Sequence, residues 1–315
     1  MNIWEELEKP ILCLAPMEGV TDVAFREVIA NAARPDLFFT EFTNVSSYAS
    51  EKGRQNALER LQISPSDPPI IAQIWGKNPA HFSEVSSALR SLSFSGIDLN
   101  FGCPDKNVNR AGGGAQMIRT PGLAVECLRN AKKSSNSLPV SVKTRLGFSF
   151  VDEYKSWLPT LLNEHPAALT VHLRTRKEMS KVPAHYELIP EILNLRDALS
   201  PETKLLINGD IKSRADAMKL YEKYPSLDGF MIGRGVFENP YCFSLDNHKP
   251  TRSELLNLLH LHLSAYEKYG FKKFEPLKHY FKIYVKDFPG ASELRAEMME
   301  CKSIEEILET VNHYS

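Results

Sequence analysis

The feature that most constrains the fold is a regular alternation of short, apolar, β-rich runs with segments that can form helices. Eight such runs lie between residues 11 and 233, each bounded by turn-forming residues. They are residues 11–15, 37–40, 69–74, 96–100, 139–144, 168–172, 204–208 and 229–233. The intervals between them hold the helix candidates 22–33, 54–61, 79–92, 121–133, 153–162, 188–199 and 214–221. Strands that alternate with helices run parallel, and near-continuous apolar strands indicate burial on both faces.

Eight strand–helix units are the number in a TIM (β/α)8 barrel, so we predict an α/β fold of that class. The rival is an open, doubly wound sheet. Its first strand-to-helix turn would carry a GxGxxG motif, but residues 15–19 read APMEG, and no GxxxxGK[ST] motif occurs in the chain.

The pattern changes after the eighth run, and this change predicts the domain boundaries. Residues 1–245 would form the barrel, residues 246–252 a polar linker, and residues 253–315 a small helical domain of three or four helices. Two helices inside the barrel carry start signals, because Asn78 precedes Pro79 and Thr120 precedes Pro121. In both cases we expect the side chain of the first residue to accept a free backbone N–H.

Charge and cysteine content exclude several classes of protein. The 38 basic and 39 acidic residues give a net charge of -1, so a site for a polyanion would have to be local. The five cysteines lie far apart without a CxxC pair, which argues against a disulfide scaffold or a metal site. The acidic N-terminus is unlike a signal peptide, and no long apolar run could cross a membrane. We therefore expect a cytoplasmic protein that makes no contact with membranes, needs no protein partner and acts as a monomer.

Polar or special residues follow each apolar run, and in a barrel these positions meet at one mouth, where enzymes of this fold place their sites. Polar loop residues alone would account for about half of them. In chain order they are Pro16, Met17 and Glu18, Thr40 and Glu41, Gln73, Asn100 and Cys103, Lys143 and Arg145, His172 and Arg174, Asn208 and Asp210, and Gly233 and Arg234.

The last two strand ends predict a phosphate site. Gly209 and the turn at residues 233–235 follow the seventh and eighth runs, where barrels commonly bind phosphate through backbone N–H groups, and Arg234 adds a cation. A phosphorylated cofactor follows from this placement. Lys143 would then lie beneath the cofactor ring, in a position suited to negative charge on a reduced flavin. An ion pair with a carboxylate is an equal alternative for this lysine.

Cys103 and His172 are candidates for proton chemistry. Cys103 stands between glycine and proline at the mouth and not in an apolar run, and its thiol, with an ordinary pKa near about 8.5, would be protonated at neutral pH. It therefore suits a proton donor better than a nucleophile. His172 could be a core histidine, but with Arg174 close by it suits a donor to a carbonyl or an anionic ring. The glycine run 112–114 is either a flexible turn or a place of close backbone approach.

These motifs resemble the tRNA-dihydrouridine synthase family over both the barrel and the tail. The similarity rests on seven ordered blocks, at residues 15–22, 73–79, 99–115, 142–147, 171–176, 208–211 and 231–235. The block Asn100-Phe101-Gly102-Cys103-Pro104 is the most specific, and the triple glycine before Ala115 is similar to the bacterial C-type subgroup. Residues 177–183 match no pattern of the family and receive no role.

The resemblance implies an FMN enzyme that reduces the C5–C6 double bond of uridines in the tRNA D-loop, with NADPH or NADH as electron donor. Hydride would pass from flavin N5 to C6, and Cys103 would supply the proton at C5. The implied flavin site consists of Pro16, Met17, Glu18, Gln73, Lys143, His172, Asn208, Gly209, Asp210, Gly233 and Arg234. The residues implied to orient the uracil are Asn100, Arg145 and Arg174.

The tail is electrically polarised in a way that suits RNA. Residues 268–286 contain six lysines and one acid, whereas residues 287–315 contain two basic and seven acidic residues. The lysine-rich part could meet a phosphate backbone, and reversing Lys278 and Lys282 should then weaken tRNA binding. We expect the aromatic residues between the lysines to belong to the core. The alternatives are a small-molecule FMN oxidoreductase of the dihydroorotate dehydrogenase type and a barrel that binds RNA without chemistry.

Overall fold

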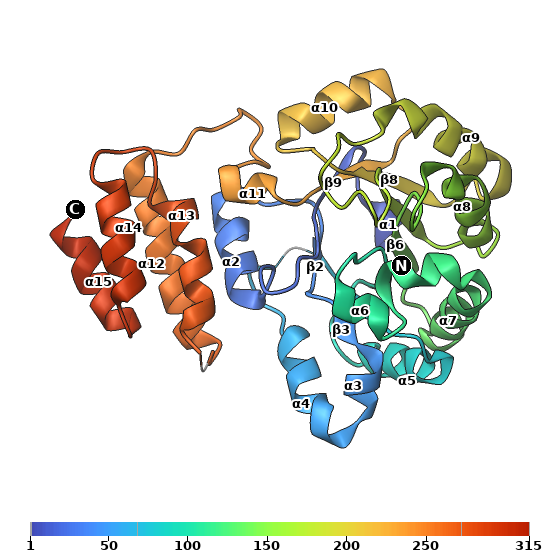
Figure 1. The fold of residues 1–315 in the computed structure, drawn as a ribbon, viewed down its shortest axis with the longest axis horizontal. Helices are drawn as coiled ribbons and strands as arrows, with labels where there is room; N and C mark the ends of the chain where they lie inside the picture. Colours follow the sequence, from blue (N-terminus) through green and yellow to red (C-terminus); the bar gives the residue numbers. More distant parts are fainter. Residues whose placement is uncertain (1, 68, 272, 315) are drawn as a thin grey trace.

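The molecule contains a ring of parallel strands that is surrounded by helices (Figure 1). A further group of helices lies against one side of this ring. This is a computed structural model, and it describes residues 2–67, 69–271 and 273–314. The strands are β1 Ile11–Leu14, β2 Phe38–Phe39, β3 Thr43–Asn44, β4 Ile70–Trp75, β5 Gly96–Phe101, β6 Val140–Arg145, β7 Ala168–His172, β8 Lys204–Asn208 and β9 Gly229–Ile232. Each of the eight expected runs contains a strand.

The strands close into a barrel, which confirms the predicted TIM-barrel class. They pair in parallel in the order β1-β9-β8-β7-β6-β5-β4-β2. The short strand β3 also pairs with β4, further along that strand than β2 does. A bridge between Cys13 and Leu37 joins β1 to the start of β2, and the N–H of Leu14 donates to the carbonyl of Leu37 at 3.1 Å. This short seam completes the ring.

The helices fill the intervals between strands, as expected. Around the barrel they are α1 Ile3–Glu6, α2 Val23–Ala32, α3 Val45–Ala49, α4 Glu51–Arg60, α5 Pro79–Leu89, α6 Lys106–Arg110, α7 Pro121–Ser134, α8 Tyr154–Leu162, α9 Ile189–Leu199, α10 Arg214–Lys223 and α11 Gly235–Glu238. Short 3-10 helices are η1 Gly114–Arg119, η2 Val151–Glu153 and η3 Tyr186–Leu188. The sequence predicts one helix over residues 54–61, but two helices, α3 and α4, project from the barrel there (Figure 1).

Of the two predicted helix caps, one is confirmed and one is wrong. Asn78 accepts the N–H of Ala80 at 3.0 Å, as its position before Pro79 predicts. Thr120 makes no side-chain cap for α7. Its hydroxyl donates instead to the carbonyl of Gln116 at 3.4 Å, because Thr120 also ends η1 and its side chain serves the preceding turn.

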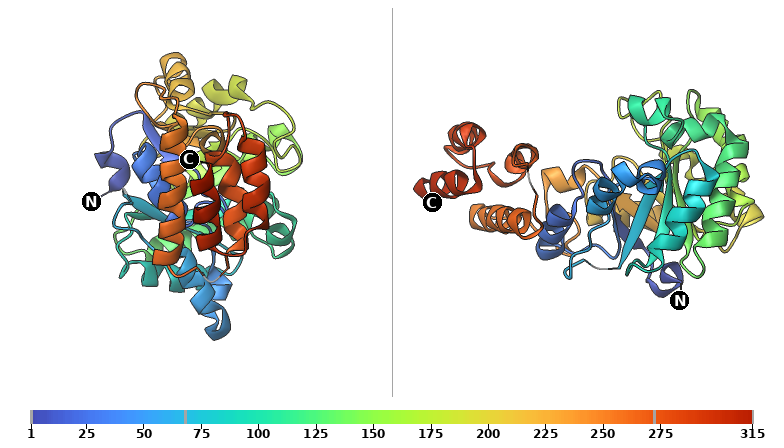
Figure 2. Two further views of the ribbon diagram at one scale, coloured as in Figure 1. Left: turned by 90° about the vertical axis from the view of Figure 1, so that its left-hand side faces the viewer. Right: turned by 90° about the horizontal axis from the view of Figure 1, so that it is seen from below.

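The tail consists of α12 Arg252–Lys268, the 3-10 helix η4 Glu275–Tyr280, α13 Phe281–Tyr284, α14 Ala291–Glu300 and α15 Ile304–His313. Figure 2 shows these helices as a layer beyond α2, on the outside of the barrel. The tail aromatics Tyr280 and Tyr284 are 2% and 0% exposed, as expected for core residues. Within the described ranges, no helix is both long and apolar enough to cross a membrane.

Candidate active site

The carboxyl ends of the barrel strands surround a cavity of about 400 Å³. In a closed parallel barrel these ends converge, so residues far apart in the sequence meet there. All predicted cofactor, substrate and acid residues except Glu18 line this cavity. They are Pro16, Met17, Gln73, Asn100, Cys103, Lys143, Arg145, His172, Arg174, Asn208, Gly209, Asp210, Gly233 and Arg234.

A chain of hydrogen bonds runs across the floor of the cavity and fixes its amide groups. Asn100 Nδ2 donates to Gln73 Oε1 at 3.0 Å, and Gln73 Nε2 donates to Asp98 Oδ2 at 2.7 Å. Ser141 Oγ donates to the other Asp98 oxygen at 2.6 Å. Burial raises the pKa of Asp98 to about 6 despite these donors. The chain holds Gln73 and Asn100 in one orientation before any ligand arrives.

Sequence reasoning missed Asp98, although a signal was present. It is the only charged residue in the apolar run 96–100, and it is 1% exposed on β5. A carboxylate inside an otherwise apolar strand that is buried on both faces needs partners, and here they lie on the two neighbouring strands.

Lys143 is a partly buried cation that has no hydrogen-bond or ion-pair partner among the described residues. No hydrogen bond or ion pair joins its ammonium to any described residue, so the alternative of a simple ion pair is not what the chain forms. Burial, with the nearby positive charge of Arg145, lowers its pKa to about 8, whereas Asp98 acts in the opposite direction. Such a group favours a ligand that brings negative charge into the cavity.

His172 is held as a neutral ring by the cations around it. Its Nε2 lies 3.2 Å from Arg174 Nη1, which can only donate, so Nε2 accepts. Burial and then the charges of Arg145, Lys143 and Arg174 keep its pKa well below the usual range. Because Nε2 accepts, the proton of the neutral ring is on Nδ1. At neutral pH the ring therefore accepts through Nε2 and can donate through Nδ1.

Two of the arginines that line the cavity, Arg145 and Arg174, are anchored by a segment for which no role is predicted from the sequence. Arg145 donates to the carbonyls of Gly102 at 2.7 Å and of Met179 at 3.2 Å, and Arg174 donates to that of Val182 at 2.6 Å. Residues 177–183 therefore hold the guanidinium groups in place. Burial lowers the pKa of Arg145 to about 10, which leaves it charged at neutral pH.

The end of the cavity beneath β8 and β9 has the features of an anion site. Gly209 and Asp210 adopt φ values of 122° and 54°, which turn the chain sharply after β8. The Asp210 carboxylate accepts from Ala184 N at 3.0 Å and pairs with Arg174. Arg234 lies 3.5 Å from Asp210 and is 62% exposed, so most of its donors are free for a ligand.

The loop that carries Cys103 is rigid. Asn100 Oδ1 accepts the N–H of Cys103 at 2.9 Å, and the Cys103 carbonyl accepts from Ala115 N at 3.0 Å. The glycine run explains the close packing, because a Cβ on Gly113 would lie 2.6 Å from Trp75 and one on Gly114 would lie 2.8 Å from the Cys103 carbonyl. Burial raises the pKa of the Cys103 thiol, so it is protonated at neutral pH.

A second cavity, of about 790 Å³, meets the first at Cys103 and Phe42, which line both. Its outer wall comes from α3 and α4, where the sequence predicts a single helix. Glu18, predicted to line the flavin, lies here and pairs with Arg60 at 2.6 Å. Further lining residues are Asn44, Ser47, Asn56 and Trp75. Trp75 belongs to the motif block at residues 73–79, and this position could have indicated that it lies at the site.

The chain matches a known protein family and individual relatives over nearly its whole length. A model of the family "Dihydrouridine synthase (Dus)" matches residues 13–315. The chain is 49% identical over 308 residues to a protein of Staphylococcus aureus (strain COL) named "Probable tRNA-dihydrouridine synthase", covering 97% of this chain and 93% of the relative. It is 48% identical over 309 residues to "Probable tRNA-dihydrouridine synthase 2" of Bacillus subtilis (strain 168), covering 97% and 94%.

The fold is similar to that of two solved proteins at low sequence identity. Morphinone reductase matches with a TM-score of 0.53 and 12% identity, over 77% of this chain and 86% of the other. An old yellow enzyme homologue from Zymomonas mobilis matches with a TM-score of 0.50 and 13% identity, over 73% and 86%. These similarities support the barrel architecture.

Proposed function

Because the chain belongs to the dihydrouridine synthase family, we propose that it reduces the C5–C6 double bond of specific uridines in the tRNA D-loop to give dihydrouridine. The observation that carries the proposal is a juxtaposition at the barrel mouth. Lys143, a partly buried lysine with no hydrogen-bond or ion-pair partner in the described ranges, lines the same cavity as Cys103, a protonated thiol. The first suits an electron-rich ring and the second suits proton donation.

We propose that the cavity of about 400 Å³ binds FMN. Arg234 and the backbone at Gly209 and Gly233 would hold the phosphate end, together with Asn208 and Asp210. Gly233 has room for this, since a Cβ there would meet nothing closer than 3.6 Å. The remaining contacts to the ring and its edges would come from Pro16, Met17, Gln73, Lys143 and His172.

Bound FMN, once reduced by NADPH or NADH, would supply the hydride that adds to C6 of the uracil. The residues of the chain then have separate tasks. Cys103 donates the proton to C5 and becomes a thiolate, which water reprotonates after product leaves. The charges of Lys143 and Arg145 on the same cavity favour that thiolate while it lasts.

The substrate side of the site follows from where the two cavities meet. Cys103 must reach the uracil, and Cys103 is shared between them, so we place the uracil at this junction. Asn100, Arg145 and Arg174 would orient its carbonyl and N–H groups. The ribose and the adjoining RNA chain would pass out through the second cavity, past Phe42 and Trp75.

The helical tail would contact the RNA backbone, but with fewer lysines than the sequence predicts. Lys268 pairs with Glu27, Lys278 donates to the Met299 carbonyl, and Lys286 donates to the Glu238 carbonyl. Lys272 lies outside the described residues. Lys273 and Lys282 are exposed and make no hydrogen bond or ion pair with the described residues, so we assign phosphate binding to them.

The test is mass mapping of nuclease fragments from unmodified tRNA incubated with the protein, FMN and NADPH. We expect one D-loop fragment to gain two hydrogen atoms, which also identifies the uridine. Absence of the gain, with the flavin still reduced by NADPH, would contradict the proposal and favour a small-molecule oxidoreductase of the dihydroorotate dehydrogenase type. Failure to bind flavin would instead favour an RNA-binding barrel without chemistry.

A further inference from the structure

The loop between β1 and α2 forms part of the wall of the first cavity, through Ala15, Pro16 and Met17. Within the loop, Met17 N donates to Thr21 Oγ1 at 2.9 Å, and the N–H groups of Val20 and Thr21 donate back to the Met17 carbonyl at 3.1 and 3.0 Å. The loop is therefore a compact turn that moves as one piece. Its position against the cavity depends on contacts from outside the turn.

The turn is held at its sides by the Glu18–Arg60 pair and by Arg26 Nη1, which donates to the Thr21 carbonyl at 2.8 Å. Two further contacts, at the tip of the turn, come from different parts of the molecule. From the barrel, the buried Glu41 accepts the N–H of Gly19 at 2.6 Å. From the helical tail, the Tyr280 hydroxyl approaches the carbonyls of Val20 at 2.8 Å and Gly19 at 3.1 Å. The tip of the turn is thus held between a carboxylate at the end of β2 and a tyrosine that lies more than 250 residues later in the chain.

Tyr280 is itself fixed by its surroundings, so its hydroxyl has a defined position. The side chain is 2% exposed, and its ring lies 4.9 Å from that of Phe25 on α2 and 4.7 Å from that of His262 on α12. His262 is fully buried and its Nδ1 is 2.8 Å from the Tyr284 hydroxyl. The rings of Phe25 and His262 therefore hold the Tyr280 ring in place beside the loop.

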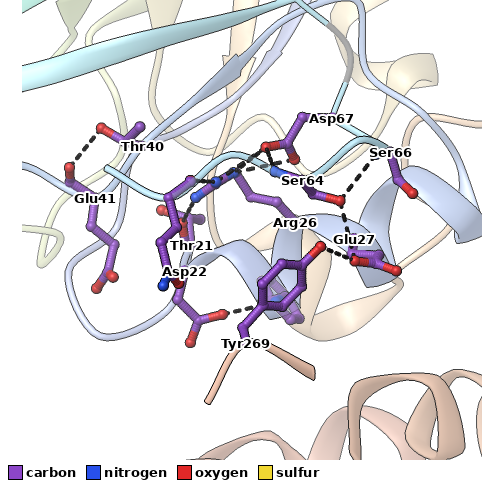
Figure 3. Close-up of polar contacts among 12 residues, drawn as sticks. Thr21, Asp22, Arg26, Glu27, Thr40, Glu41, Ser64, Ser66, Asp67 and Tyr269 are labelled. Atoms are coloured by element: carbon purple, nitrogen blue, oxygen red, sulfur yellow. Dashed lines mark hydrogen bonds and ion pairs between the residues drawn. The ribbon is translucent and has the colours of Figure 1, made fainter. Parts of the chain in front are cut away.

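A separate cluster docks the tail to the barrel without touching the loop. Glu27 on α2 accepts from Lys268 Nζ at 3.0 Å, from the Tyr269 hydroxyl at 2.5 Å and from Ser64 Oγ at 3.1 Å. Figure 3 shows Tyr269 and Ser64 meeting at this carboxylate, away from Glu41. Tyr269 therefore belongs to the same interface, but its hydroxyl contacts Glu27 on α2 and not the loop.

We propose that Tyr280 is a positioning residue through which the helical tail sets the shape of the cofactor cavity, and hence the affinity for flavin. The inference rests on the proposed flavin site and extends it to a residue of the tail. When the hydroxyl is removed, the two carbonyls lose their donor and the turn at residues 17–21 gains freedom. Flavin must then order the turn on binding, which costs affinity.

The experiment is a fluorescence titration of apoprotein with FMN, for the wild type and three tyrosine-to-phenylalanine variants. Tyr280→Phe should bind FMN about three- to tenfold more weakly, the effect of one ordinary hydrogen bond. Tyr269→Phe loses a docking contact and Tyr284→Phe loses a buried bond to His262, and both should keep the wild-type affinity. These controls match the change in chemistry and differ only in the partner of the hydroxyl.

Hydrogen–deuterium exchange of a peptide covering residues 15–22 provides a second measurement that does not depend on flavin. Exchange in this peptide should be faster in Tyr280→Phe and unchanged in Tyr284→Phe. Equal flavin affinity in wild type and Tyr280→Phe, or an equal loss in all three variants, would overturn the inference alone. A wild type that binds no FMN would overturn the proposed function and this inference with it.

Discussion

The barrel mouth and the interface between barrel and tail both bury charged side chains, but the charges differ in sign and in how they are satisfied. At the mouth the buried groups are mainly cations, and Lys143 has no partner in the described chain. At the interface they are mainly acids, and Glu27 has partners on both sides, including Lys268 and Tyr269. An unpaired buried charge is costly. The mouth therefore suits a ligand that brings negative charge, whereas the charges of the interface are satisfied by the chain itself.

Glu41 lies between these two cases. It is 8% exposed and accepts one N–H, from Gly19, while Asp22 and Glu18 repel its charge and Arg60 favours it. Burial and the two neighbouring acids raise its pKa to about 7. The comparison teaches that a contact can position a loop and still leave a charge only partly compensated.

The largest effect that would sharpen the comparison is expected at Cys103. Cys103→Ala should bind FMN normally and accept electrons from NADPH, while turnover on tRNA falls by about 10²- to 10⁴-fold, the usual contribution of a general acid. Single-turnover assays on tRNA measure this directly. Cys127→Ala is the control, since that thiol is buried in α7 and lines neither cavity. Full activity of Cys103→Ala would place the acid elsewhere.

Lys143→Met tests whether the Lys143 charge at the mouth is uncompensated in the apoprotein. We expect FMN affinity to fall by about ten- to a hundredfold, as for loss of a charged contact. The melting temperature of the apoprotein should rise, because a partly buried cation with no partner in the described chain has been removed. Titration and thermal unfolding measure the two effects. Lys204→Met, at the opposite end of β8, should leave FMN affinity unchanged. A destabilised Lys143→Met apoprotein would mean that the lysine is satisfied within the chain.

Glu41→Gln tests the intermediate case through pH. A carboxyl whose pKa is about 7 in the folded chain and about 4.5 when unfolded binds its proton more tightly in the folded state. Its contribution to stability is complete below pH of about 4.5 and is lost as pH rises to about 7. The variant should therefore lose less stability over this range, by on the order of 2 kcal/mol. Urea unfolding at several pH values measures it, and parallel pH profiles for the two proteins would contradict it.

The smallest effect is expected on the outer face of the tail. Reversing Lys273 and Lys282 to glutamate should weaken tRNA binding several-fold and reduce the slope of log affinity against log salt by about one to two. Binding assays at several salt concentrations measure both. Lys302→Glu, in the acidic half of the tail, is the matched control. An unchanged salt slope would remove this face from the RNA interface.

The sequence predicted the barrel and the gathering of its polar residues because both follow from periodicity. Each apolar run ends at a fixed place in the fold, so residues as distant as Gln73 and Arg234 were expected at one mouth without knowledge of any contact. Asp98 was predictable on the same grounds, as a charge inside a buried run. Whether these residues bind the ligands assigned to them stays a prediction, and so do the domain boundaries at residues 246–252.

Contacts that depend on the path of a loop were not predictable. The carbonyls that anchor Arg145 and Arg174 belong to residues 177–183, and no pattern in the sequence shows that this segment folds back over the cavity. Glu18 stands next to Met17 in the same motif but faces Arg60 on α4, because the turn directs neighbouring side chains to different cavities. Side-chain partners of this kind are decided by tertiary packing.

The seam of the barrel between β1 and β2 suggests a structural role for the tail. The Cys13–Leu37 bridge and the hydrogen bond from Asp36 N to the Leu12 carbonyl, at 2.9 Å, join the chain there, and α2 is the helix that connects β1 to β2. The tail rests on α2 through Glu27 and Phe25. Because the tail packs on the helix that connects the two seam strands, we expect tail and barrel to unfold in one cooperative transition, although the sequence predicts two domains.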